Sequence, residues 1–383
     1  STPTPTPTPT PVPQEHLEAG ESALLRGDWD SAAQAYRQAL SQSADEDAKA
    51  QAQLGLGSTQ LRAEQYQDAV QTITAFIEVY PEHALLADAH YLRARAYQYS
   101  GENTLAVADY DRYLELKPGI LEAVVRERCG DLLREAGQAA AAVERYRSAS
   151  AYTAAGDALD LRVKIGLALQ DAGDLEGALS EFEQVKQQTD SDSQTAAMNL
   201  LIGKILEEQG NFDGAYALYL ESVQNYPDSY DTYLGLVALV EAGIEVDEFQ
   251  RGLIDYNAGA YEPALAAFNR VLEVAADGTT LYFRGLTSLA LGDPAAARQD
   301  FAAVIQGYPQ NPYWADAYSQ KAVVEWAYLD LPGEAIQTYT NFVDAAPEHG
   351  FSPDMLFAAG RTAERAGLLE RAGELWIRIP GEY

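Results

Sequence analysis

Apolar residues along the chain recur at a spacing that predicts helices. In ten stretches a small residue is followed four positions later by an aromatic residue or Ile, and three positions after that by another residue expected in the core. Steps of four and three place all three on one helix face. The small residues are Ala32, Ala69, Ala106, Ala142, Ala178, Ala215, Ala264, Ala297, Ala335 and Ala372, and their partners are Tyr36, Ile73, Tyr110, Tyr146, Phe182, Tyr219, Phe268, Phe301, Tyr339 and Trp376.

A second helix is expected before each of these stretches, with its own small residue twelve positions before the alanine. Eight of these ten residues are Gly, although a Gly inside a helix costs about 1 kcal/mol relative to Ala. Close approach of the two helices explains the choice, because a side chain there would hold them apart. The ten positions are Gly20, Gly57, Ala94, Gly130, Gly166, Gly203, Gly252, Gly285, Val323 and Gly360.

Turn-forming residues divide the predicted helices. Gly followed by Asp, Glu or Asn separates the two helices of several pairs, and prolines end several second helices, at Pro81, Pro118, Pro227, Pro309 and Pro347. Successive alanines of the pattern are 33 to 38 residues apart, except for one step of 49. The longer step contains residues 229–243, which we predict to form an inserted amphipathic helix capped by Asp228 and ended by Gly243.

This pattern resembles the tetratricopeptide repeat (TPR), whose unit is two antiparallel helices. The resemblance covers about residues 14–380 and implies an all-α fold, a TPR-type α-solenoid with a right-handed superhelix. About ten helix pairs and one inserted helix are expected. The predicted divisions are a Thr/Pro-rich extended linker, repeats one to six, the inserted helix, and repeats seven to ten, at residues 1–13, 14–227, 228–246 and 247–383.

Composition narrows the classes of partner. The net charge of -32 excludes a nucleic-acid surface and basic docking on anionic lipid. No apolar run is long enough to span a membrane. With Cys129 as the only cysteine, no internal disulfide can form, and we expect Cys129 to be a packing residue. The four histidines are scattered, so we expect neither a metal site nor a cofactor.

The chain opens with STPTPTPTPTPVP, in which every second residue is Pro from position 3. Each Pro lacks a backbone donor and favours extended geometry in the residue before it, so this segment cannot be a helix. We interpret it either as a disordered tail or as a spacer of about 40 Å that holds the helical array off a surface. The spacer interpretation indicates an extracytoplasmic protein of the envelope or cell exterior, tethered upstream, for instance by a lipid anchor.

Residues expected on the inner face of the solenoid, which the first helix of each pair lines, are the candidate binding residues. A Lys/Asn pair that holds a chain-terminal carboxylate in chaperone-binding TPR proteins is absent. Aromatic rings there either stack on sugars and peptide side chains or are buried between repeats. The candidates are Tyr91, Arg95, Tyr99, Phe249, Tyr282, Tyr328, Phe357 and Arg361.

A further resemblance concerns the bacterial envelope. Helix ends such as EVYPEH, QNYPDS and QGYPQN, and the order of array, insertion and YWADAY segment, are similar to the superhelical region of soluble lytic transglycosylases. Those enzymes cleave peptidoglycan with a Glu in a Glu-Ser pair that a Gly-Leu-Met-Gln stretch follows. The pairs Glu21-Ser22 and Glu221-Ser222 lack that stretch and fall in predicted helices, so no catalytic residue is assigned.

The leading hypothesis is therefore a non-catalytic TPR binding scaffold of the bacterial cell envelope. Its partner would be a protein, a peptide or peptidoglycan, and the chain would be the superhelical part of a lytic transglycosylase. The alternative is a protein-protein assembly scaffold, intracellular or in the envelope, without a cell-wall role. We also expect the array to continue past Tyr383, with Leu375, Trp376 and Ile379 facing the next repeat.

Overall fold

The computed structural model describes residues 13–152 and 158–382, and these residues form helices and turns without a β-strand. The chain divides into two compact units, and the division falls between Gln188 and Thr189. None of the described helices combines the length and the apolar character that a membrane crossing requires. Apart from Pro13, which begins the first helix, the Thr/Pro-rich linker lies outside the described residues.

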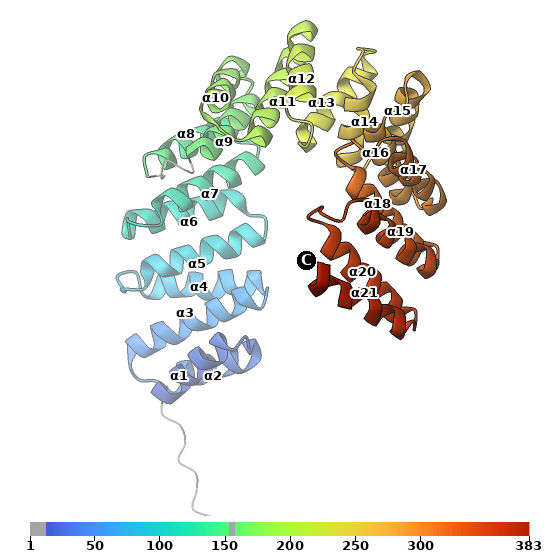
Figure 1. Cartoon of the computed structure of the whole chain (residues 1–383). Coiled ribbons are helices and arrows are strands. Elements are labelled where there is room, and N and C mark those ends of the chain that lie inside the picture. Colours follow the sequence, from blue (N-terminus) through green and yellow to red (C-terminus); the bar gives the residue numbers. More distant parts are fainter. Residues whose placement is uncertain (1–12, 153–157, 383) are drawn as a thin grey trace, which may run out of the picture. The chain divides into compact units, whose positions relative to one another are not determined.

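Unit 1 consists of five helix pairs in chain order, each a first helix followed by its antiparallel second helix (Figure 1). The helices are α1 (Pro13–Leu25), α2 (Trp29–Gln42), α3 (Glu46–Arg62), α4 (Tyr66–Val79), α5 (Leu86–Tyr99), α6 (Asn103–Leu116), α7 (Glu122–Glu135), α8 (Ala139–Ser150), α9 (Ala158–Asp171) and α10 (Leu175–Gln188).

Unit 2 consists of five further pairs and one unpaired helix. The helices are α11 (Asp192–Glu208), α12 (Phe212–Asn225), α13 (Tyr230–Glu241), α14 (Glu248–Asn257), α15 (Tyr261–Val274), α16 (Gly278–Ala290), α17 (Pro294–Gly307), α18 (Trp314–Val323) with the π-helical turn η1 (Val324–Tyr328), α19 (Pro332–Ala345), α20 (Ser352–Arg365) and α21 (Leu369–Glu382). Ten pairs and the inserted helix α13 confirm the predicted fold class. The predicted boundary at residue 227 stays a prediction.

Helices pack on their neighbours along each unit. Every first helix contacts its own second helix, and most second helices contact the first helix of the next pair. First helices also meet one another, as α1 meets α3, α3 meets α5 and α7 meets α9. The surface of unit 1 that α1, α3, α5, α7 and α9 form is called its inner face below, after the corresponding surface of TPR arrays.

The eight glycines predicted where the two helices of a pair approach closely, called the crossing glycines below, lie at such positions. The predicted cause, a lack of space for a side chain, is confirmed. A Cβ built on any of the eight would lie within 3 Å of the aromatic or Ile side chain sixteen positions later. At Gly20 the nearest atom is Tyr36 Cε1, at 2.8 Å, and at Gly252 it is Phe268 Cε1, at 2.6 Å. The ten alanines of the pattern are all at most 1% exposed. In these pairs a large side chain of the second helix thus lies directly on the bare backbone of the first.

The ninth repeat departs from the predicted register. Ala322 is fully buried and belongs to the same apolar cluster as Tyr339, whereas Val323 is only half-buried. Ala322, thirteen positions before Ala335, therefore takes the crossing position that the repeat spacing assigns to Val323. The turn η1 accommodates the additional residue, because π-helical hydrogen bonds span five residues instead of four.

The helices end at the glycines that the sequence predicts, but the cap of the inserted helix differs from the prediction. Gly27, Gly101, Gly173, Gly210 and Gly292 have φ between 77° and 82°, the left-handed conformation that ends a helix. Helix α13 is capped by the Ser229 hydroxyl, which accepts from the Asp231 N–H, and not by Asp228. The Asp228 carboxylate instead accepts from the Asn257 side chain at 2.8 Å.

The last helix also differs from expectation. Leu375 is 1% exposed and Trp376 lies against Gly360, so both pack inside the tenth pair and do not face outward. Ile379 packs against the same cluster. The large apolar side chains that α21 exposes are Leu369, at 69%, and Ile377, at 75%.

Candidate functional site

Three predicted binding residues come together on α5 in unit 1. Tyr91 lies against Tyr110 and Tyr113, with ring centroids 5.7 and 5.2 Å away. Arg95 donates to the Tyr99 hydroxyl at 3.1 Å. Tyr99 is 52% exposed, so this end of α5 offers an aromatic surface to a partner.

Two predicted residues of unit 2 are instead packed among aromatic rings. Tyr282 on α16 is 8% exposed and stacks on Tyr313, with ring centroids 4.6 Å apart. Phe249 on α14 lies 6.0 Å from Phe268 and 6.2 Å from Phe283. Burial removes Tyr282 from the set of contact residues, which corrects the expectation for this position.

The remaining predicted residues lie on the last two repeats. Tyr328 at the end of η1 is 58% exposed, and Phe357 on α20 is 54% exposed. Arg361 on α20 lies 3.8 Å from the Glu364 carboxylate one turn later. These side chains are accessible, but no contact joins them into a pocket in the part of the chain that the structure describes.

Three residues that were not predicted as binding residues, Arg128, Tyr110 and Gln98, lie beside these α5 side chains. Arg128 on α7 donates to the Tyr110 hydroxyl at 3.5 Å, and that hydroxyl donates to Gln98 Oε1 at 3.1 Å. Contact with the hydroxyl groups of Tyr110 and Tyr91 raises the pKa of the Arg128 guanidinium. Hydrogen bonding from Arg95, with a smaller contribution from Arg128, lowers the pKa of the Tyr99 hydroxyl. Both arginines therefore act on one cluster of tyrosines.

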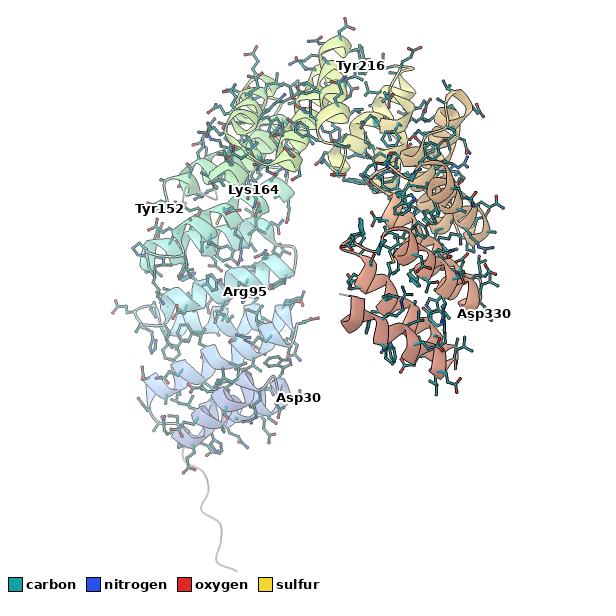
Figure 2. The ribbon with its side chains drawn as sticks, in the orientation of Figure 1. Asp30, Arg95, Tyr152, Lys164, Tyr216 and Asp330 are labelled. Atoms are coloured by element: carbon teal, nitrogen blue, oxygen red, sulfur yellow. The ribbon has the colours of Figure 1, made fainter. Side chains whose placement is uncertain are left out.

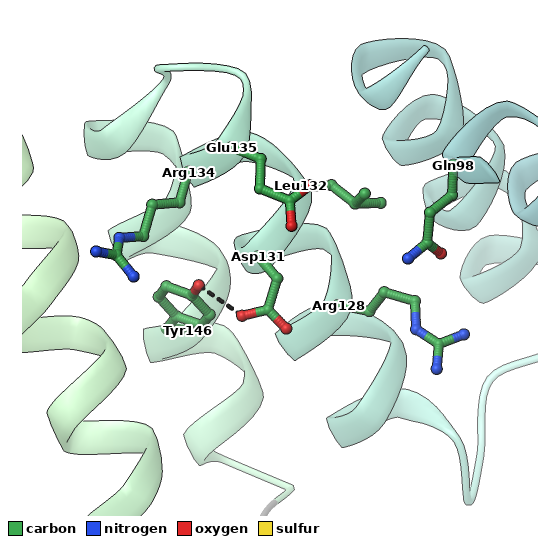
Figure 3. Close-up of a pocket in the computed structure, with 7 residues that line it drawn as sticks. All are labelled: Gln98, Arg128, Asp131, Leu132, Arg134, Glu135 and Tyr146. Atoms are coloured by element: carbon green, nitrogen blue, oxygen red, sulfur yellow. Dashed lines mark hydrogen bonds between the residues drawn. The ribbon is translucent and has the colours of Figure 1, made fainter. Parts of the chain in front are cut away.

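Arg128 lines a pocket of about 480 Å³ between α5, α7 and α8 (Figure 3). Most charges on its walls are paired. Lys164 lies 2.8 Å from Asp131 and 2.7 Å from Glu127, and the Tyr146 hydroxyl donates to Asp131 at 2.8 Å. The other lining residues are Gln98, Leu132, Arg134, which pairs with Asp171, and Glu135, which accepts from Asn103.

Arg95 and Arg128 are different from these paired cations. In residues 13–152 and 158–382, neither arginine has a carboxylate within 4 Å, and their polar contacts are with tyrosines. Figure 2 shows Arg95 and Lys164 among the side chains of unit 1. Most arginines of the described chain have a carboxylate within 4 Å, and Arg95 and Arg128 belong to the minority that do not; both contact the same cluster of tyrosines.

A buried ion pair holds α5 in place behind this cluster. Arg93 donates to both Asp109 oxygens, at 2.6 and 2.8 Å, and His90 Nδ1 lies 2.7 Å from the same carboxylate. Although burial opposes it, hydrogen bonding to Arg93 and His90 lowers the pKa of Asp109 below its usual value. The pair ties α5 to α6 and so positions Arg95, two residues further along α5, and Tyr99, one helical turn beyond that.

A second pocket of about 480 Å³ lies on the inner face between α1, α3 and α5. Its walls are mostly apolar, with Leu24, Leu54 and Leu92 among them, and the acids Glu21 and Asp47 also line it. Unit 1 thus carries an apolar, acidic pocket on its inner face and a pocket lined by the unpaired Arg128. This arrangement suits an extended or helical protein segment better than a small molecule.

Groups that could carry chemistry are sequestered or dispersed. Cys129 is fully buried, and burial raises the pKa of its thiol to about 12, so it stays protonated at neutral pH. Among the described residues no three His, Cys, Asp or Glu side chains converge on a metal-sized site. His83 contacts Asp47, and His90 contacts Asp109, so the two histidines do not share a site.

Comparison with protein families agrees with the repeat pattern. The model of the tetratricopeptide repeat matches residues 163–230 and 249–312, and the model of an outer membrane lipoprotein family, YfiO, matches residues 11–115. A search among curated proteins found no match. The matched ranges carry tetratricopeptide repeats, and the whole array has this all-α fold.

Solved structures with a similar fold include three TPR-like proteins. A crystal structure of MamA is 22% identical, covering 46% of this chain and 90% of its own, with a TM-score of 0.39. MamA from Desulfovibrio magneticus RS-1, from residue 41 to its end, is 15% identical. The match covers 47% of this chain and 97% of that chain, with a TM-score of 0.38. A tetratricopeptide repeat protein from Parabacteroides merdae is 15% identical. This match covers 82% of this chain and 98% of that chain, also with a TM-score of 0.38. Similarities this low carry no inference about partners.

Proposed function

We propose that this chain is a non-catalytic scaffold of the bacterial envelope that binds a protein partner on the inner face of unit 1. The observation that carries the proposal is the cluster of Tyr99, Arg95 and Arg128, which combines an exposed aromatic ring with two unpaired guanidinium groups. Aromatic and Arg side chains are the residues that contribute most to protein interfaces.

The envelope location is supported by the match to the outer membrane lipoprotein family over residues 11–115. The Thr/Pro-rich segment of residues 1–13 has the composition of a spacer, and a lipid anchor upstream of it would tether the array to a membrane surface. Of the alternative from the sequence, an intracellular or envelope assembly scaffold without a cell-wall role, the intracellular form has no comparable support.

A cell-wall role as the superhelical part of a lytic transglycosylase is a weaker proposal. It has no support from the matched families, which are a lipoprotein family and a repeat family. Of the aromatic residues offered for sugar stacking, Tyr282 is buried and Phe249 is packed between two phenylalanine rings. A protein partner is therefore favoured over peptidoglycan.

The test is affinity capture from solubilised envelopes by the purified chain and by an Arg95→Gln/Tyr99→Ala variant. A protein captured by the first and not by the second is then purified and titrated against both, and the proposal expects at least a tenfold loss of affinity in the variant. Equal affinity for both chains would contradict binding at this face. In parallel, release of soluble muropeptides from peptidoglycan by the chain would overturn the non-catalytic assignment.

A further inference from the structure

We propose that Arg95 and Arg128 bind the side-chain carboxylate of an Asp or Glu in an extended segment of the partner protein. This inference rests on the proposed function and adds the chemistry of the partner. The occupant is an acidic residue followed or preceded by an apolar side chain that lies on Tyr99.

The missing counter-charge of Arg95 and Arg128 is the first argument. The chain has more than two acidic side chains for each basic one, and most arginines on the two units have a carboxylate at 2.5 to 3.8 Å. Arg95 and Arg128 have only neutral tyrosine hydroxyls as polar contacts among the described residues. A phenol does not neutralise a guanidinium, so a carboxylate from outside would supply the missing charge.

Donor geometry is the second argument. A guanidinium has five N–H groups, whereas Arg95 contacts the hydroxyl of Tyr99 and Arg128 contacts only the hydroxyls of Tyr110 and Tyr91. Arg128 faces the 480 Å³ pocket beside Gln98, whose carbonyl oxygen is already taken by the Tyr110 hydroxyl. Donors therefore outnumber acceptors on this side of the pocket, which favours a ligand group that only accepts.

The opposite wall of the pocket limits the charge of the ligand. The carboxyl groups of Asp131 and Glu135 line it, and Asp131 is paired with Lys164. Because like charges repel, a ligand group with a single negative charge is better tolerated beside these carboxyl groups than a phosphate, which carries nearly two negative charges. A chain-terminal carboxylate is disfavoured by the absence of the Lys/Asn pair noted above, so a side chain is the source to which we commit.

The neighbouring aromatic surface defines the rest of the segment. Tyr99 stacks on Tyr66, with ring centroids 5.4 Å apart, and its ring is held by the contact with Arg95. Held rings offer contact area at low entropic cost, so an apolar residue next to the acid should add affinity.

The experiment uses random twelve-residue peptides with amidated ends, displayed as a library and selected on the full chain. We expect the selected peptides to share one Asp or Glu beside an apolar residue. Changing that Glu to Gln should weaken binding at least tenfold in calorimetric titrations, and Arg95→Gln/Arg128→Gln should weaken it by a similar factor. On the double variant, the Glu and Gln peptides should bind equally.

Two further variants separate charge from folding. Arg112→Gln on α6 removes an exposed arginine that pairs with Glu115 and should leave affinity unchanged. Arg95→Lys/Arg128→Lys retains the charge and should recover part of the affinity, which a merely misfolded variant would not.

Three results would overturn the carboxylate proposal. They are selected peptides without a common acid, a Gln peptide that binds as well as the Glu peptide, and a failure to select any peptide. If a partner is still captured in the envelope experiment, each of these leaves the scaffold function standing and removes only the acidic-segment assignment.

Discussion

The third repeat (α5 and α6) and the seventh repeat (α14 and α15) differ in the partner that they provide for an arginine of the first helix. Both have an arginine one position before the crossing residue, Arg93 in α5 and Arg251 in α14. In the third repeat the second helix supplies Asp109, which binds Arg93 with two hydrogen bonds, and the eighth repeat repeats this with Arg284 and Asp300. In the seventh repeat Ala267 occupies the corresponding position.

The missing acid leaves polar atoms without partners in the seventh repeat. Arg251 Nε and Asp255 Oδ2 are buried 3.8 Å apart, and neither has a hydrogen bond among the described residues. Burial raises the pKa of Asp255 to about 6, against the opposing effect of Arg251. The third repeat thus has hydrogen-bonded polar groups inside and an exposed Tyr99, whereas the seventh has unpaired polar atoms inside and packs Phe249 against Phe268 and Phe283.

The largest effect is expected when the third repeat is made to resemble the seventh. Asp109→Ala leaves the Arg93 guanidinium without its counter-charge and His90 without its hydrogen-bond partner, and breaking such a pair typically costs about 3–5 kcal/mol. Urea unfolding followed by circular dichroism measures the change in the free energy of unfolding. A loss below about 1 kcal/mol would show that the pair contributes little to holding α5 against α6.

The crossing position gives the next largest difference. The third repeat has Ala94 there, whereas the seventh has Gly252 with Phe268 lying over it. Gly252→Leu should destabilise the fold by about 1–3 kcal/mol or more through overpacking, and Ala94→Gly should cost only about 1 kcal/mol of helix propensity. Thermal melts that show equal effects for the two changes would mean that the crossing geometry is wrong.

A smaller effect should depend on pH. Asp255 has a folded-state pKa near 6, above the usual value near 3.9, so the folded state binds a proton that the unfolded state has lost. Its contribution to stability is full below about pH 4 and is lost as the pH rises through 6. Asp255→Asn should remove this dependence and stabilise the chain at pH 7 by about 1–2 kcal/mol, with little change at pH 4. Unfolding curves at both pH values test this, and a destabilised variant at pH 7 would contradict it.

The smallest effect on stability is expected at the exposed ring of the third repeat. Tyr99 is 52% exposed, so Tyr99→Ala should change the free energy of unfolding by less than about 0.5 kcal/mol. The same change should reduce partner binding. A stability loss of several kcal/mol would show that Tyr99 belongs to the core and not to a binding surface.

Sequence reasoning predicted the repeated features because they are local. The spacing of Ala32 and Tyr36, or of Gly20 and Ala32, is set inside one helix pair and recurs in nearly every pair. The ninth repeat was misread because a π-helical turn changes the spacing by one residue without a strong residue signal. The Ala322–Ala335 spacing of thirteen was the available clue.

The candidate site was less predictable because exposure depends on neighbouring repeats. Tyr282 and Tyr99 were equal candidates, but Tyr282 is buried against Tyr313, whereas Tyr99 stays half exposed although it stacks on Tyr66.

Arg128 was missed for a different reason. It was not among the residues of the first helices that were expected on the inner face. Asp131, three residues later, stands at ion-pair spacing, so the sequence alone favours a paired arginine. In the structure Asp131 binds Lys164 and the Tyr146 hydroxyl instead, and these partners come from other helices. Only the packing of α7 against α8 and α9 therefore reveals that Arg128 lacks a counter-charge.

The central claim is that a partner binds the inner face of unit 1 beside Tyr99. It is tested most directly by placing a photoreactive benzoyl-phenylalanine at position 99 and, as a matched control, at the similarly exposed position 112 on α6. Irradiation of envelopes that contain each variant should yield a covalent adduct with a partner protein from position 99 and none from position 112. An adduct from position 112 alone would contradict the account.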